Sequence, residues 1–419
     1  MSIRIAGREY AGKKRYVAGT HRTRTPQQTL DDYQRFMKPL GITRLANITG
    51  LDCIGVPVYL AVRPASRGLA TSQGKGIDVA SAKASALMET IESWHAEHID
   101  RPLRHESARA LRRSREVIDV TTLPLSIGAS LEPELPLLWI EGWDLLREQA
   151  VWVPHETAST NFVMPRDHLP HFVQSSNGLA SGNHLLEAIV HALCEVIERD
   201  AWSLWELGNQ AEAKRTQIDL ASIRDPLCAE LLARIARADI GAALWDITSD
   251  VGIPAYKCTI YERDDRPHWR RVGTSGGFGC HLAPEVAAMR AISEAIQSRL
   301  TTIAGSRDDM FEAYDSLATE PEVLKVMVDE LTTPPPTAAF SARRSRATET
   351  FEGDLEVLLS ALRAVGLDSA IVIDLSKDEI GIPVVKVLVP GLEARLPSVQ
   401  PGARTRRRRE ALAREGKAR

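Results

Sequence analysis

Residues 183–202 have apolar side chains every three or four positions, which predicts an amphipathic helix. Its polar side is unusually acidic, because four ionisable side chains share an arc of about 80° at about 100° per residue. Like charges at this spacing repel one another, and only Arg199 is near in sequence to balance them. Taken alone, this helix has two interpretations. In the first, its acidic face is solvated and Asn183 is the N-cap; in the second, the acidic face binds a cation. The four residues are Glu187, His191, Glu195 and Glu198.

Two other predicted helices, within residues 72–97 and 273–310, repeat this polar face. Each of the three helices follows a glycine-rich stretch, and a glycine-rich turn before a helix offers N–H groups to anions. Carboxylates favour hard cations. Three matched faces therefore predict Mg²⁺ bridging a polyphosphate. The matching positions are Ser81, Ser85, Glu89 and Glu92 in the first helix and Arg290, Glu294 and Gln297 in the last.

A second repeat predicts strands. Residues 45–64, 243–262 and 372–391 each read as an apolar strand, a polar turn, a Gly-Val/Ile-Pro step and a second apolar strand. The proline begins the second strand, where a missing hydrogen-bond donor is tolerated. We expect a mixed α/β (α+β) fold in which three antiparallel strand-turn-strand units are layered against helices and the acidic faces converge on one cleft.

Composition narrows the class of protein. The 419 residues are 44% apolar with a net charge of −3, enough for a sizeable core. The sequence has neither a membrane-length apolar run nor a signal peptide, which predicts a cytoplasmic protein without membrane contact. Its five scattered cysteines form no CxxC pair and indicate neither a disulfide framework nor a zinc site.

The end of the chain differs in charge. Residues 402–419 contain eight Lys/Arg and two Glu. We expect residues 396–419 to form a disordered, solubilising tail that follows a catalytic domain over residues 1–395. The alternative is that this basic tail contacts nucleic acid or a protein. Since we favour the disordered tail, nucleic acid is not the expected partner.

Familiar nucleotide motifs are absent. The Walker pattern GxxxxGK[ST] would need glycine at Leu69 and a hydroxyl at Gly76, and the GxGxxG pattern fails at Leu282. An ATP site in this chain must have another design.

Three longer motifs resemble one family. GKG precedes SxxxExxE at Ser85, the second acidic helix reads N-x3-E-x7-E-x2-ER from Asn183, and AISEAIQSR is followed by GSRDD. Over about residues 13–393 the chain resembles the YcaO family of ATP-dependent peptide-backbone-modifying enzymes. The resemblance implies ATP and Mg²⁺ as cofactors. The implied metal ligands are Glu89, Glu92, Glu187, Glu195 and Glu198, the implied nucleotide contacts are Lys13, Thr20, Lys75, Ser85, Glu89, Asn183, Glu187, Glu195 and Glu294, and the implied catalytic residues are Glu198, Arg199 and Gln297.

Some of these assignments have alternatives. Lys14, His21 and Arg22 fit the spacing as well as Lys13 and Thr20 do, and a solvated charge is the alternative for Lys75.

The resemblance also implies a chemistry, in which phosphorylation turns an amide oxygen into a leaving group. The run GTHRTRTPQQTL is most similar to the TfuA-associated subgroup, which implies a thioamide product, a peptide or protein substrate and a TfuA-like sulfur-delivery partner. The end of the chain lacks the PxPxP pattern of azoline formers. An azoline-forming cyclodehydratase, a small-molecule ligase or kinase and a non-catalytic ATP-binding scaffold are the alternatives, and a homodimer is left open.

Overall fold

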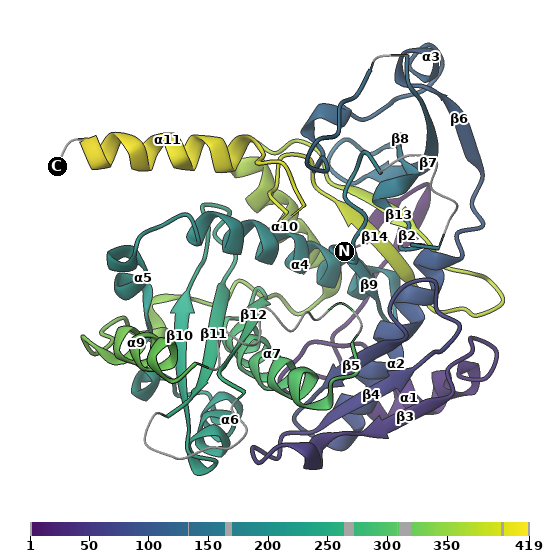
Figure 1. The fold of residues 1–419 in the computed structure, drawn as a ribbon. Helices are drawn as coiled ribbons and strands as arrows, with labels where there is room; N and C mark the ends of the chain where they lie inside the picture. The colour runs from purple at the N-terminus through teal and green to yellow at the C-terminus, as the bar shows by residue number, and fades with distance from the viewer. Residues whose placement is uncertain are drawn as a thin grey trace.

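The computed structural model describes residues 2–132, 134–163, 170–263, 272–307, 309, 320–394 and 398–417. Antiparallel sheets and helices alternate in it, which confirms the predicted mixed α/β class (Figure 1). No helix in these ranges is both long and apolar enough to cross a membrane. The helices are α1 Pro26–Tyr33, α2 Val79–Glu97, α3 Ala108–Leu111, α4 Leu185–Trp205, α5 Gln210–Thr216, α6 Pro226–Arg237, α7 Pro284–Ala304, α9 Pro321–Thr332, α10 Phe351–Ala364 and α11 Ala403–Lys417.

The three predicted strand pairs are present, and each gains a third strand. The resulting units are β3-β4-β5, β10-β11-β12 and β13-β14-β9, all antiparallel. The first two are separate sheets, whereas the third belongs to a six-stranded sheet of order β6-β7-β13-β14-β9, in which β8 also pairs with β7. The strands are β1 Ile3–Ile5, β2 Arg8–Tyr10, β3 Arg44–Asn47, β4 Val58–Val62, β5 Thr71–Lys75, β6 Leu103–Ser107, β7 Pro136–Asp144, β8 Gln149–Pro154, β9 Leu179–Ser181, β10 Ile240–Asp246, β11 Ala255–Glu262, β12 Thr274–Cys280, β13 Ile371–Asp374 and β14 Val384–Leu388.

The third strand of each sheet leads directly into an acidic helix: β5 into α2, β12 into α7 and β9 into α4. In the first two units the strand pair precedes its helix, whereas β13 and β14 follow α4 by more than a hundred residues. The three units thus share one architecture, and one of them is permuted in chain order.

Glycines of two of the predicted anion-binding turns lie in strands instead. Gly74 lies in β5 and Gly277 in β12, and both pack against a helix backbone. A Cβ at Gly277 would lie 2.2 Å from the amide nitrogen of Ala295. Glycine therefore permits the close contact of strand and helix, which brings each acidic face near its sheet.

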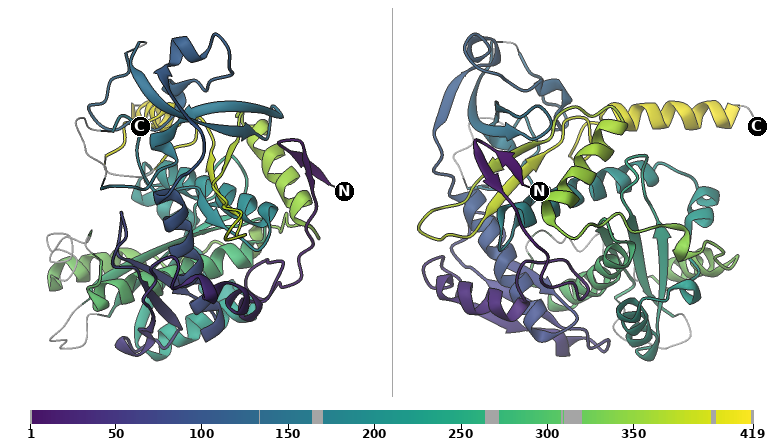
Figure 2. Two further views of the ribbon diagram at one scale, coloured as in Figure 1. Left: turned by 90° about the vertical axis from the view of Figure 1, so that its right-hand side faces the viewer. Right: turned by 180° about the vertical axis from the view of Figure 1, so that it is seen from behind.

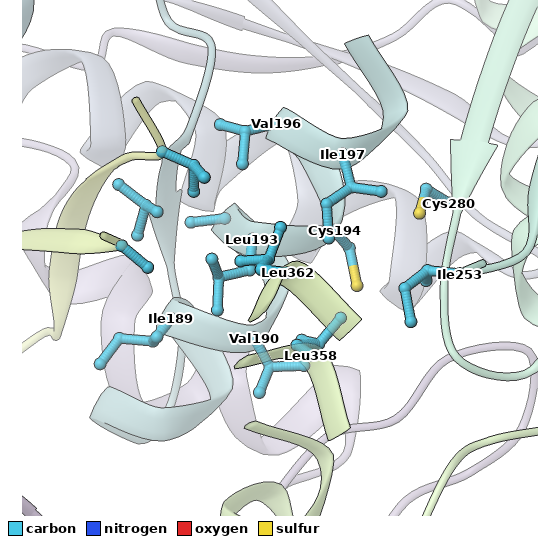
Figure 3. Close-up of a cluster of buried hydrophobic side chains, with 14 of the residues drawn as sticks. Ile189, Val190, Leu193, Cys194, Val196, Ile197, Ile253, Cys280, Leu358 and Leu362 are labelled. Atoms are coloured by element: carbon cyan, nitrogen blue, oxygen red, sulfur yellow. The ribbon is translucent and has the colours of Figure 1, made fainter. Parts of the chain in front are cut away.

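Helix α4 lies at the centre of the molecule. Its apolar side, including Ile189, Leu193 and Ile197, packs against Leu358 and Leu362 of α10 (Figure 3). Its N-cap is His184, whose Nδ1 accepts from the amide of Leu186 at 3.2 Å, and not the predicted Asn183. Burial of the apolar side fixes the direction in which the acidic side points.

Residues 403–417, for which a disordered tail is predicted, form α11 and project from the body (Figures 1 and 2). Arg404 donates to both carboxylate oxygens of Asp200 at 2.9 Å, and Asp200 is fully buried on α4. The amide of Thr405 donates to Glu393 at 2.8 Å. These long-range contacts order the segment despite its composition. The predicted boundary at 395/396 lies outside the described residues.

Candidate functional site

Side chains from α2, α4 and α7 meet in one charged cluster. The Nζ of Lys75, at the end of β5, lies 3.3 Å from Glu294 Oε2 and 2.8 Å from Gln297 Oε1 on α7. Burial raises the pKa of Glu89 on α2 and of Glu198 on α4, and the nearby charge of Glu294 raises both further, so all three helices contribute. The predicted convergence of Glu89, Glu198 and Gln297 is therefore present.

Four of these carboxyl groups hold protons unusually tightly. Burial raises the pKa of Glu89 to about 7, that of Glu92 to about 8 and that of Glu198 to about 7, and it also raises the pKa of Glu195. Neighbouring carboxylates raise them further, because like charges within a low-dielectric site disfavour ionisation. Burial and mutual repulsion therefore favour the protonated form of these carboxyl groups.

Glu294 behaves in the opposite way. Burial alone would raise its pKa, but Lys75, Arg199 and Arg290 together lower it. Glu294 is therefore ionised beside these three cations, whereas Arg199 and Arg290 do not bring the pKa of Glu195 or Glu198 down to its usual range.

Two buried polar atoms of the cluster have no hydrogen-bond partner among the described residues. These are Glu198 Oε2 and Arg290 Nε, whereas Glu198 Oε1 lies 3.4 Å from Arg199 Nη2. A buried acceptor without a donor is costly, so such atoms indicate an additional binding partner. The clustered carboxyl groups and the unpaired Glu198 oxygen fit a divalent cation, and the unpaired arginine N–H fits an anionic group such as phosphate.

Two predicted metal ligands already have protein partners. Glu92 Oε1 accepts from the amide of Ser181 at 2.8 Å and from its hydroxyl at 2.7 Å. Both oxygens of Glu187 are engaged, Oε2 by the amide and hydroxyl of Thr23 at 2.8 Å and Oε1 by Asn183 at 3.3 Å. These contacts position Glu187, and its role as a metal ligand stays a prediction.

The remaining predicted residues on these helices surround the cluster. Ser85 lies one turn before Glu89 on α2 and has no hydrogen bond within the described chain, so its hydroxyl is available. Asn183 also accepts from the hydroxyl of Thr29 at 3.1 Å. Gln297 Nε2 donates to the carbonyl of Gln73 at 2.8 Å, which fixes the amide that contacts Lys75.

The N-terminal segment contributes through residues other than Lys13 and Thr20. Arg22 Nε lies 3.6 Å from Glu187 Oε1, and Thr23 bonds the same carboxylate. Lys13 is exposed, and within the described residues no hydrogen bond or ion pair joins its side chain or that of Thr20 to the cluster. Spacing alone does not show which of several neighbouring polar residues faces inward.

Sequence reasoning missed Thr23, Ser181 and Lys386. Lys386 lies on β14, and its Nζ donates to the carbonyl of Ser175 at 2.5 Å. Burial lowers its pKa to about 8, while Glu195 acts in the opposite direction. A lysine inside the apolar strand VVKVL was the available signal, because a buried lysine requires a polar partner.

No three His, Cys, Asp or Glu side chains within the described chain lie at the spacing of a preformed metal site. The metal-binding roles of the individual glutamates therefore stay predictions.

The fold is mixed α/β, and the acidic cluster contains two polar atoms without a hydrogen-bond partner among the described residues. Together they define a class of α/β proteins suited to a metal-bound anionic ligand. The chain belongs to the YcaO family, described as "YcaO cyclodehydratase, ATP- and Mg²⁺-binding", whose sequence pattern matches residues 73–393. This confirms the family resemblance and, at the level of the family, the expected cofactors ATP and Mg²⁺.

Relatives and solved structures agree with this membership. The chain is 37% identical over 380 residues to an "uncharacterized protein in tfuA 3′ region" of Rhizobium leguminosarum bv. trifolii, covering 88% of each chain. It is similar to a "heterocyclase in complex with substrate and cofactor" (TM-score 0.77, 25% identity), covering 94% of this chain and 55% of that one. It also shares the fold of YcaO from Methanopyrus kandleri bound with AMPPCP and Mg²⁺ (TM-score 0.72, 23% identity, 93% and 99% coverage).

Proposed function

We propose that this protein uses ATP and Mg²⁺ to activate a peptide backbone amide and replaces the amide oxygen with sulfur. The observation that carries the ATP-dependent step is the cluster of buried carboxyl groups with raised pKa on α2 and α4, of which Glu198 retains an unpaired oxygen. Such a site favours a divalent cation together with the polyphosphate that it neutralises.

The roles of the side chains follow from their charges. Glu89, Glu195 and Glu198 would hold Mg²⁺, while Lys75, Arg199 and Arg290 would bind phosphate oxygens. Bound Mg²⁺ supplies neutralisation of the charge on the transferred phosphoryl group. Gln297 and Glu294 hold the ammonium group of Lys75 in place. The protein thus contributes positioning and electrostatic stabilisation, which are the main requirements of phosphoryl transfer.

In the proposed reaction the amide oxygen attacks the γ-phosphorus, and ADP leaves. Hydrosulfide then adds to the amide carbon. The carbon–oxygen bond breaks, phosphate leaves with the original oxygen, and loss of a proton gives the thioamide. Each step moves an electron pair without net oxidation or reduction.

The cysteines of the chain support an external sulfur source. Burial raises the pKa of Cys258 to about 12 and also raises that of Cys228 and Cys280, so these thiols stay protonated. Cys53 is exposed, but partial burial and the neighbouring Asp52 raise its pKa as well. Because a thiolate is the nucleophile in sulfur chemistry, none of these four thiols is activated to carry sulfur.

A TfuA-like protein is the proposed sulfur-delivery partner. The relative encoded in a tfuA 3′ region supports this assignment. Since sulfide is small, free sulfide should partly replace the partner in vitro.

Mass spectrometry tests the product. The purified protein is incubated with Mg²⁺-ATP, sodium sulfide and synthetic peptides corresponding to short genes beside its own gene. A thioamide is heavier than its parent amide, and its formation should require both ATP and sulfide. A lighter product, formed only where Cys, Ser or Thr follows the reacting residue, would contradict the proposal.

An azoline-forming cyclodehydratase is the second candidate, favoured by the similarity to the heterocyclase. In that reaction a side chain of the peptide is the nucleophile, so the product would form without sulfide. The same mass measurement therefore separates the two candidates.

A further inference from the structure

A groove of about 580 Å³ lies away from the carboxylate cluster, between α1, β3 and the N-terminal end of α2. These elements lie together in Figure 1. The volume is in the range of about 300–1,000 Å³ typical of ligand sites. Its lining combines apolar side chains with amides and two cations, and no acidic residue takes part. Among the lining residues are Gln27, Leu30, Met37, Arg44, Leu45 and Lys83.

One wall of the groove is the open edge of a sheet. Strand β3 pairs only with β4 in the sheet β3-β4-β5. The amide of Ile48 bonds to the carbonyl of Val58, and backbone groups alternate in direction along an antiparallel strand. The amides and carbonyls of Leu45 and Asn47 therefore point away from β4. An unpaired strand edge is a template for another extended chain.

The charges at the groove are uncompensated. Neither Arg44 nor Lys83 forms an ion pair with an acidic side chain in the described ranges. The ammonium of Lys83 lies 5.3 Å from the ring centroid of Tyr59. Positive charge beside apolar side chains favours an occupant that is both acidic and apolar.

We propose that this groove binds an acidic, extended segment of the peptide substrate by adding it as a strand to the edge of β3. Main-chain hydrogen bonds from Leu45 and Asn47 would supply affinity, and the apolar pocket would accept alternate side chains. This inference rests on the proposed function, because it assumes a peptide substrate. It assigns the recognition of that peptide to a surface outside the carboxylate cluster.

Helix α2 connects the groove with the cluster. Lys83 and Glu89 are six residues apart, which separates them by about 9 Å along the helix and by about 120° around its axis. One flank of α2 thus lines the groove, and another carries the carboxylates. A peptide held in the groove could place a later residue at the reacting centre.

Fluorescence anisotropy tests the inference with a dye-labelled octapeptide of alternating Val and Glu. The wild-type protein should bind it more tightly than the alternating Val and Lys peptide. Reversal of both groove charges, Arg44→Glu with Lys83→Glu, should weaken binding of the acidic peptide by about tenfold or more and reverse the preference. A peptide with N-methyl groups on alternate amides should lose affinity, since it cannot complete a strand.

The matched control is Arg113→Glu with Arg115→Glu, which reverses two exposed charges outside the groove lining and should leave binding unchanged. Peptide-independent ATP turnover should be unchanged in both double variants. The inference is overturned if the folded wild-type protein shows no saturable binding, if both peptides bind equally, or if the groove variant binds as the wild type does.

A second copy of the chain is the competing occupant. Sedimentation analysis decides between the two occupants. If the wild-type protein is a dimer and the Arg44→Glu, Lys83→Glu variant is a monomer, β3 mediates dimerisation and the peptide assignment is overturned. Failure of peptide binding with normal Mg²⁺-nucleotide binding would remove only this inference. Normal peptide binding without ATP-dependent modification would remove only the proposed function.

Discussion

Glu198 illustrates how single residues are placed for charge rather than for stability. It is almost completely buried, and its Oε2 has no hydrogen-bond partner among the described residues. Replacement by glutamine preserves the shape of the side chain and removes the charge. We expect Glu198→Gln to abolish most ATP turnover while the melting temperature stays equal or rises, because repulsion within the cluster is relieved.

The control for this prediction is Glu230→Gln. Glu230 lies on the exposed face of α6, where it contacts Arg234 and Arg237. Its replacement should leave turnover unchanged. Wild-type turnover in Glu198→Gln would remove this residue from the proposed site.

The raised pKa values of the same carboxyl groups predict a pH dependence. Glu89, Glu92 and Glu198 hold protons in the folded state up to a pH of about 7 to 8, whereas in the unfolded chain they ionise near 4.5. Their contribution to stability is therefore present below about 4.5 and is lost as the pH rises through 7 to 8. A bound cation requires the ionised form.

Thermal unfolding measures this effect. The increase in melting temperature caused by Mg²⁺ and AMPPCP should grow between pH 6 and pH 8.5, because fewer protons must then be displaced. At each pH, the melting temperature of the ligand-free protein is subtracted. This removes the effect of groups whose protonation does not change when the ligand binds. An increase that shrinks over this range would contradict the cluster as the cation site.

At the scale of elements, the close contact of β12 with α7 depends on glycine. A Cβ at Gly277 would lie 2.2 Å from Ala295 N and 2.4 Å from Ala291 O, whereas a Cβ at Gly276 would find only Cys258 O at 3.9 Å. We expect Gly277→Ala to lower the free energy of unfolding by about 1–3 kcal/mol or more, and Gly276→Ala to be neutral or stabilising. Urea unfolding of both variants checks the difference, and equal stabilities would contradict the packing.

A buried ion pair between Arg404 and Asp200 joins α11 to α4. Arg404→Ala would leave Asp200 buried on α4 with only the amide of Glu393 as a remaining partner among the described residues. Removal of one member of a buried pair typically costs about 3–5 kcal/mol. Arg407→Ala, at an exposed position of the same helix, is the control and should cost little.

Denaturant unfolding compares the two arginine variants. Because Asp200 directly follows Arg199, Arg404→Ala should also reduce nucleotide turnover. Equal stabilities of the two variants would show that α11 is not held by this pair.

At the scale of the whole molecule, periodicity and repeats predicted the strand pairs and the acidic helices. Those features are local, because the periodicity of each segment shows which side is buried. The third strands and the permuted order of the β13-β14-β9 unit were not predictable, since they depend on pairing between distant segments. The contacts of Arg404 with Asp200, and of Thr23 with Glu187, are likewise long-range and leave no local pattern.

The most direct test of the account is calorimetric titration of the protein with AMPPCP in the presence and absence of Mg²⁺. The account predicts saturable binding that requires Mg²⁺, that weakens by about tenfold or more in Glu89→Gln and Glu198→Gln, and that Glu230→Gln retains. Binding of equal strength without Mg²⁺, or unchanged binding in both cluster variants, would contradict the claim that these carboxylates hold the metal-bound nucleotide.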